Sequence, residues 1–184
     1  MGAIKVHEFT TLDGSVGTPM WTVDYEFTDE LAAAIGQLTD PDGAILLGRN
    51  TYEMFAPAWS NRTVKEDPGA PYFNETRKYV VSGTLQSADW NNSTVLGAYD
   101  AEAIRRLKES VDGTLYVSGS GTLVRALLAD GLVDELHLFV YPVALGEGPR
   151  LFREGDPALT LTLVASESFD NGVVHLTYGP AAQQ

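Results

Sequence analysis

The chain has 184 residues, of which 25 are Asp or Glu and 12 are Lys or Arg, so its formal net charge is -13. This balance excludes most nucleic-acid binders, because an acidic surface repels phosphate backbones. The absence of Cys excludes disulfides and cysteine nucleophiles, and no apolar run approaches the roughly 20 residues that a membrane-spanning helix needs. We expect one domain over residues 1–184, with no membrane partner and, since the first ten residues lack the pattern of a signal peptide, a cytoplasmic location.

Short β-rich runs alternate with helical patterns along most of the chain. The first expected strand, over 4–9, ends in the turn Thr11-Leu12-Asp13-Gly14, because Asp and Gly supply the backbone freedom that a reversal needs. Thr28 is the expected N-cap of a helix that places Leu31, Ala34, Ile35 and Leu38 on one apolar face. The remaining expected elements, in chain order, are a buried strand over 44–47, a helix carrying Tyr52 to Trp59, an exposed loop over 60–74, strands over 78–82 and 93–96, a helix capped by Asp100, a strand over 114–117, a helix ended by Gly131, a strand over 135–140, and strands over 160–164 and 173–178 around the hairpin turn 170–172.

This order of elements predicts the fold class. Repeated strand-to-helix units favour a mostly parallel sheet, and the C-terminal hairpin adds an antiparallel edge. The run Ala44-Ile45-Leu46-Leu47 is continuously apolar, which is typical of a strand that is buried on both faces. We therefore expect an α/β domain with helices on both sides of a central sheet.

Two glycine turns, Gly48 to Thr51 and Ser118 to Thr122, each lie between a buried strand and the start of a helix. A glycine lets a phosphate approach the backbone, and the first amides of the helix then point at the anion. Both turns follow the carboxyl ends of strands, where open α/β sheets bind ligands. Neither is the dinucleotide fingerprint G-x-G-x-x-G, so each is either a phosphate site or an ordinary strand-to-helix connection.

Arg49 follows directly on a buried strand, where its guanidinium suits bidentate contact with a phosphate. The alternative is a local ion pair with Glu53, four residues further along the expected helix. The histidines His7, His137 and His175 stand alone on separate strands without metal-ligand spacing. We therefore expect no metal site, and no serine hydrolase, because the nucleophile motif G-x-S-x-G is absent.

Aromatic side chains near strand ends and turns could stack on a flat heterocycle, and Trp21, Phe55 and Tyr141 are the candidates for substrate contact. Aromatic residues at helical spacing, such as Phe55 with Tyr52, can equally belong to the core. Asp13, in the turn after the first strand, is the candidate acid or substrate ligand, and the alternative is that it only forms the turn.

The motifs Thr11-Leu12-Asp13-Gly14, Leu47-Gly48-Arg49-Asn50-Thr51-Tyr52-Glu53 and Tyr79-Val80-Val81-Ser82 resemble the dihydrofolate-reductase superfamily. The block from Tyr116 through Gly131 to Gly146 is the most specific part of the similarity. The branch with the greatest resemblance is the reductase domain of riboflavin biosynthesis, the RibD C-terminal type, in its free-standing bacterial form. The resemblance covers nearly the whole chain and implies a three-layer α/β fold with a mostly parallel sheet, NADPH as cofactor, and a homodimer.

The resemblance also implies roles for individual positions. Gly48, Arg49, Asn50 and Thr51 would meet the phosphates of NADPH, and Ser82 with Gly83 would lie near the adenosine 2′-phosphate. The pyrophosphate would be held by Gly119, Ser120, Gly121, Thr122 and Leu123. Asp13 would face the substrate beside the nicotinamide.

The leading hypothesis is an NADPH-dependent reductase of a small heterocyclic substrate, related to 5-amino-6-(5-phosphoribosylamino)uracil reductase. The first alternative is a ligand-binding module that keeps the cofactor pocket without turnover. The second is a dihydrofolate reductase proper. That enzyme has an acid on its first helix, whereas the stretch from Leu31 to Ile35 is apolar here, so Asp24 or Asp29 would have to replace the acid.

Overall fold

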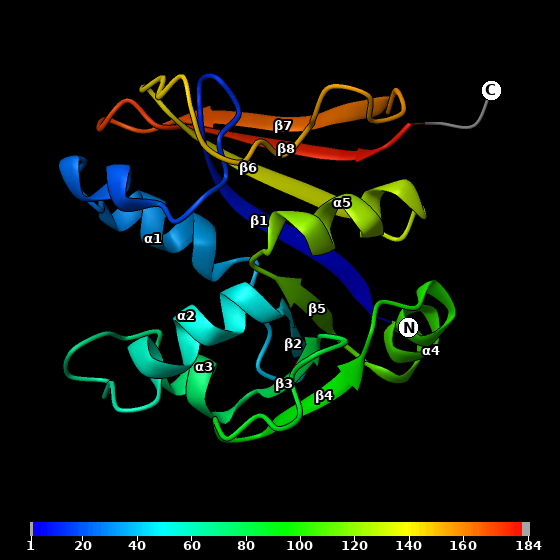
Figure 1. Cartoon of the computed structure of the whole chain (residues 1–184). Helices are drawn as coiled ribbons and strands as arrows, with labels where there is room; N and C mark the ends of the chain where they lie inside the picture. Colours follow the sequence, from blue (N-terminus) through cyan, green and yellow to red (C-terminus); the bar gives the residue numbers. More distant parts are fainter. Residues whose placement is uncertain (1, 182–184) are drawn as a thin grey trace.

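The computed structural model describes residues 2–181 and contains one eight-stranded sheet with helices on both faces (Figure 1). The strands are β1 (Ala3–Thr11), β2 (Ala44–Gly48), β3 (Arg77–Val81), β4 (Ser93–Gly97), β5 (Thr114–Val117), β6 (Glu135–Tyr141), β7 (Leu161–Ser168) and β8 (Val174–Pro180). The helices are α1 (Asp29–Gly36), α2 (Arg49–Trp59), α3 (Ala70–Glu75), α4 (Ala101–Ser110) and α5 (Gly121–Ala129), with a short 3-10 helix η1 (Met20–Asp24). Within residues 2–181, none of the helices has the length and apolar character needed to cross a bilayer.

The strand order is β4-β3-β2-β5-β1-β6-β8-β7. Six neighbouring strands, from β4 to β6, are parallel, whereas β8 pairs antiparallel with both β6 and β7. The predicted fold class is therefore confirmed, including the antiparallel edge at the C-terminus. The carboxyl ends of β1, β2, β3 and β5 consequently meet at one edge of the sheet, which is where the glycine turns begin.

Two hydrophobic cores pack on opposite faces of the sheet. Helices α4 and α5 cover one face through Ile104, Leu123 and Leu127, while α1, α2 and α3 lie over the other (Figure 1). Strand β2 is buried along its whole length because side chains from both faces are covered. The apolar run over 44–47 therefore has the environment that its sequence predicts.

The helix ends follow the predicted caps. The hydroxyl of Thr28 accepts a hydrogen bond from the amide of Leu31 at 3.2 Å, and Asp100 accepts bonds from two amides at the start of α4. After α5, Gly131 adopts a left-handed conformation with φ of 63°, which is the backbone geometry that ends many helices. These local signals fix where α1, α4 and α5 begin or end.

The expectation of a loop throughout 60–74 is wrong, because α3 occupies its last part. Pro71 lies in the first turn of α3, where a missing amide costs nothing, so proline there starts a helix instead of breaking it. The other end of α3 is held by the fully buried Lys78, whose Nζ donates to the carbonyl oxygens of Phe73, Asn74 and Thr76.

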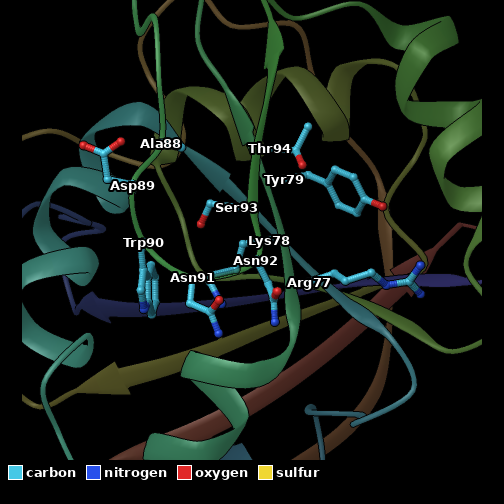
Figure 2. Close-up of a pocket in the computed structure, with 10 residues that line it drawn as sticks. All are labelled: Arg77, Lys78, Tyr79, Ala88, Asp89, Trp90, Asn91, Asn92, Ser93 and Thr94. Atoms are coloured by element: carbon cyan, nitrogen blue, oxygen red, sulfur yellow. The ribbon is translucent and has the colours of Figure 1, made fainter.

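A shallow pocket of about 450 Å³ surrounds Lys78 at the amino ends of β3 and β4. The Lys78 ammonium lies 4.5 Å from the ring centre of Trp90, while the neighbouring Arg77 extends away from that ring (Figure 2). Burial lowers the pKa of Lys78 to about 8. Since three carbonyl oxygens already bind the ammonium, this lysine closes the end of α3 and has no spare donor for a ligand.

Candidate active site

The two glycine turns are in direct contact. The amide of Gly48 donates to the carbonyl oxygen of Gly119 at 3.3 Å. A side chain at position 48 would place its Cβ 2.3 Å from Oγ of Ser120, so only glycine fits between the two turns. Gly119 has a φ of 76°, which also favours glycine. The structure thus joins two segments that are about 70 residues apart into one backbone-lined cradle.

This cradle has the chemistry of an anion site. Gly48 and Ser120 are the N-cap residues of α2 and α5, and neither makes a side-chain cap. The first amides of both helices therefore point outward without intrahelical partners, and both helix dipoles favour negative charge there. Thr51 is buried with its hydroxyl close to Gly119. The side chain of Leu123 packs in the core, so this predicted contact could be made only by its amide.

The side chain of Arg49 contacts Glu53 and Thr84. Its Nε lies 3.5 Å from Oε1 of Glu53, which is the expected local ion pair, and its Nη1 donates to Oγ1 of Thr84 at 2.8 Å. The hydroxyl of Ser82 accepts from the amides of Thr84 and Leu85 and so shapes the turn after β3. Arg49, Ser82 and the exposed Gly83 therefore lie together at the ends of β2 and β3, beside the cradle.

A cavity of about 1230 Å³ opens beside the cradle. It is bounded by segments from β1, the loop after it, α1, α2, the chain that leads into α3, and the turn between β5 and α5. Predicted residues in its wall are Asn50, Thr51, Phe55, Gly119, Ser120, Gly121 and Thr122. Asp29, named in the dihydrofolate reductase alternative, also lines it, from the first turn of α1.

Aromatic rings form the part of this cavity that lies away from the cradle. The rings of Trp59 and Phe73 stack at 4.2 Å, Phe55 meets Phe73 edge-on at 5.8 Å, and Arg62 lies 4.6 Å above the Trp59 ring. Phe55 therefore lines the cavity, and its contact with a substrate stays a prediction. Trp21 and Tyr141 do not, because both are buried in the core beneath α1, where Tyr141 packs edge-on against Phe9.

Two polar side chains of β1 that sequence reasoning missed also line the cavity. His7 and Glu8 are 5% and 7% exposed, and neither Nε2 of His7 nor Oε1 of Glu8 has a hydrogen-bond partner within residues 2–181. Nδ1 of His7 bonds to the Tyr116 hydroxyl at 2.7 Å. Burial, with smaller effects from His137 and His175, lowers the pKa of His7 to about 3, so its ring is neutral.

Asp13 is held by a turn and does not line the cavity. Its carboxylate accepts hydrogen bonds from the Thr11 hydroxyl at 2.6 Å and from the amides of Leu145 and Gly146, while Arg150 bonds to its backbone carbonyl and lies 3.4 Å from Oδ2. The Thr11 bond and the Gly146 amide lower the pKa of Asp13 to about 2. A carboxyl group with this pKa is ionised at neutral pH, so the geometry favours the turn-forming alternative over a proton donor.

The histidines do not stand alone, contrary to the sequence expectation. Nδ1 of His137 and Nε2 of His175 are 2.9 Å apart, and their outer nitrogens bond to Glu135 and Glu167. This chain of four side chains crosses β6, β8 and β7, away from the cavity. Among the described residues no cluster of three His, Asp or Glu side chains has the geometry of a metal site.

Comparisons with known proteins agree with this architecture. The chain is 29% identical over 174 residues to the uncharacterized protein YyaP of Bacillus subtilis strain 168, covering 91% of this chain and 89% of that protein. A deaminase/5-amino-6-(5-phosphoribosylamino)uracil reductase from Thermotoga maritima superposes with a TM-score of 0.67 and 18% identity, over 98% of this chain and 57% of that one. Dihydrofolate reductase from Enterococcus faecalis, solved with NADP(H), gives a TM-score of 0.64 and 15% identity over 96% and 95% of the two chains.

The two structural likenesses establish the fold, which is that of the dihydrofolate reductases. The family model described as the RibD C-terminal domain matches residues 3–175, which is nearly the full length. The sequence motifs at both glycine turns lie within that match. The chain is therefore a member of the RibD C-terminal domain family.

Proposed function

We propose that this protein is an NADPH-dependent reductase of a small heterocycle of the aminouracil or pteridine kind. The observation that carries the proposal is the cradle of Gly48, Gly119 and Ser120, which opens into an aromatic-lined cavity. Family membership supports a reductase, and the Enterococcus neighbour binds NADP(H) in the same fold. The bound dinucleotide would supply the hydride.

The residues of this chain fit such a ligand in two parts. The first amides of α2 and α5 and the hydroxyl of Thr51 would hold the phosphates, and Arg49 beside Ser82 would meet the additional phosphate of NADPH. The rings of Phe55 and Phe73 would exclude water and hold a flat substrate in the remaining space. The protein would thus act mainly by positioning two ligands against each other.

Titration with NADPH tests the proposal. Cofactor fluorescence and the thermal midpoint should both change at micromolar to millimolar NADPH, as usual for cofactor sites. Oxidation of NADPH should then be measured with aminouracil, pteridine and quinone acceptors. The absence of any change at about 1 mM NADPH would contradict cofactor binding altogether. Binding without oxidation of NADPH by any acceptor would favour the ligand-binding module.

One observation favours dihydrofolate reductase as a second candidate. Asp29 lines the cavity from the first turn of α1, so a carboxylate is present on the first helix although its apolar stretch lacks one. Dihydrofolate-dependent oxidation of NADPH that is blocked by an antifolate, and lost in Asp29→Asn, would establish this activity. The cytoplasmic location and the homodimer stay predictions.

A further inference from the structure

Glu8 is an acidic residue on the face of β1 whose preceding side chains belong to the hydrophobic core. It follows Ile4 and Val6 on the same face of β1, and both of those side chains are fully buried. Glu8 itself is 7% exposed, and its Oε1 has no hydrogen-bond partner within residues 2–181. A buried carboxyl oxygen without a partner is costly, so its presence here points to a ligand or a function.

The carboxyl group lies directly beneath the anion cradle. Oε1 of Glu8 is 3.7 Å from the position that a Cβ on Gly119 would occupy, so it lies beside the turn that is proposed to hold the phosphates. Glu8 also lines the cavity together with Ser118 and Gly121. An ionised carboxylate here would repel any phosphate in the cradle, because Glu8 is buried and lies close to the Gly119 turn.

The charged and titratable groups that act on Glu8 come from two elements. Arg125 of α5 attracts its carboxylate form, but no ion pair links the two residues in the described part of the chain, and the guanidinium instead donates to the Arg150 carbonyl and the Thr122 hydroxyl. Tyr116 of β5 keeps its proton, since burial raises its pKa. The positive charge that faces Glu8 is therefore already engaged elsewhere.

We propose that Glu8 enters the dinucleotide complex as a neutral acid, so that NADPH binding takes up a proton whenever the free site holds Glu8 as a carboxylate. The inference rests on the proposed cofactor site and adds a residue to it. In its protonated form Glu8 presents one O–H donor toward the ligand and does not repel the phosphates. In its ionised form its negative charge repels them and weakens NADPH binding.

Glu8 is already largely protonated at neutral pH in the free protein. Burial raises the pKa of Glu8 from 4.5 to about 8, and the weaker effect of Arg125 acts in the opposite direction. The neutral form therefore predominates at pH 7 and is lost above pH 8. NADPH should consequently bind best near neutral pH, and its dissociation constant should increase with pH above about 8.

The test compares wild type with Glu8→Gln, which has nearly the same shape but does not ionise. The NADPH dissociation constant is measured by fluorescence from about pH 7 to about pH 9.5. We expect it to rise at least tenfold in wild type and to stay flat in Glu8→Gln, with the two proteins equal near pH 7. Glu109→Gln, at an exposed position on α4, is the matched control and should keep the wild-type profile.

A second measurement needs no variant. Calorimetric titration of wild type with NADPH, at about pH 8.5 in two buffers of different ionisation enthalpy, should show net proton uptake of more than about half a proton per site. Superimposable pH profiles for wild type and Glu8→Gln, or no proton uptake, would overturn the inference while leaving the cofactor site intact. Failure of wild type to bind NADPH at any pH would instead overturn the proposed function.

Discussion

The amide of Gly48 donates a hydrogen bond to the carbonyl oxygen of Gly119, and this bond joins the ends of strands β2 and β5. The two residues belong to turns that would each be unremarkable as a strand-to-helix connection. In contact, they bring the starts of α2 and α5 together. The proposed anion site is therefore a property of the pair, because neither turn alone brings together the first amides of two helices.

Replacing Gly48 by Ala should separate the two turns. The new Cβ would lie 2.3 Å from Oγ and 3.1 Å from the amide nitrogen of Ser120, so the cradle would have to widen. We expect NADPH affinity to fall at least tenfold, or about 1.4 kcal/mol, in equilibrium titrations. Gly179→Ala, where the nearest atom is at an ordinary 3.4 Å, is the control. Unchanged affinity in Gly48→Ala would place the phosphates elsewhere.

Arg49→Ala should distinguish the two roles of this arginine. If the guanidinium meets the additional phosphate of NADPH, the variant loses about tenfold in NADPH affinity and little in NADH affinity. Glu53→Gln removes only the exposed ion pair and should alter the free energy of unfolding by less than about 0.5 kcal/mol. Equal affinities of Arg49→Ala and wild type for both dinucleotides would leave the arginine with its local pair alone.

Asp13→Asn should lower the stability of the fold, because the carboxylate holds a turn and does not line the cavity. The carboxylate binds one hydroxyl and two amides, and its pKa in the folded protein is lowered from 3.8 to about 2. Because the folded pKa is the lower one, the stabilisation is fully present above pH 3.8 and is lost as the pH falls toward 2.

Urea unfolding checks this at several pH values. The free energy of unfolding of wild type should exceed that of Asp13→Asn by a constant amount at neutral pH. The two free energies should converge near pH 2. A variant of unchanged stability with abolished turnover would instead restore Asp13 as the catalytic acid.

Lys78→Met should destabilise the protein although it keeps an apolar stem of similar length. The carbonyl oxygens of Phe73 and Thr76 would lose the Lys78 donor, whereas that of Asn74 would keep Asn91, and each buried unsatisfied group costs about 1–3 kcal/mol. Chemical denaturation should show a loss of more than about 2 kcal/mol in the free energy of unfolding. Arg77→Met, which alters the exposed neighbour on β3, should have almost no effect on the same measurement.

Much of the fold follows from local sequence patterns. The apolar run over 44–47 and the caps Thr28 and Asp100 gave positions for elements that the structure confirms. Helix α3 was missed because a proline-rich polar stretch is typical of loops, and its stabilising lysine lies outside it in the sequence. Contacts of that kind cannot be inferred from the segment alone.

The parts of the candidate site that are formed by the backbone could be predicted from the sequence. The parts that depend on how side chains pack were harder to predict. Glycine turns between strand and helix identified the cradle, since their position at strand ends follows from the topology. The burial of Trp21 and Tyr141 depends on how α1 packs over them. From the sequence alone, such an aromatic ring could point into the core or into the cavity. Glu8 did leave a signal: an acid at the position after Ile4 and Val6 on the core-facing side of a strand.

Strand β1 is synthesised long before the two strands that it pairs with in the sheet. This strand comes first in the chain but lies fifth in the sheet, where Ala3 pairs with Thr114 and the amide of Ile4 bonds to Asp134. At roughly 5–20 residues per second, a ribosome needs on the order of ten seconds to add the partners that β1 lacks. The backbone amides and carbonyls of β1 therefore stay without their native partners until β5 and β6 have been made, and native pairing of this strand begins only when most of the chain has emerged.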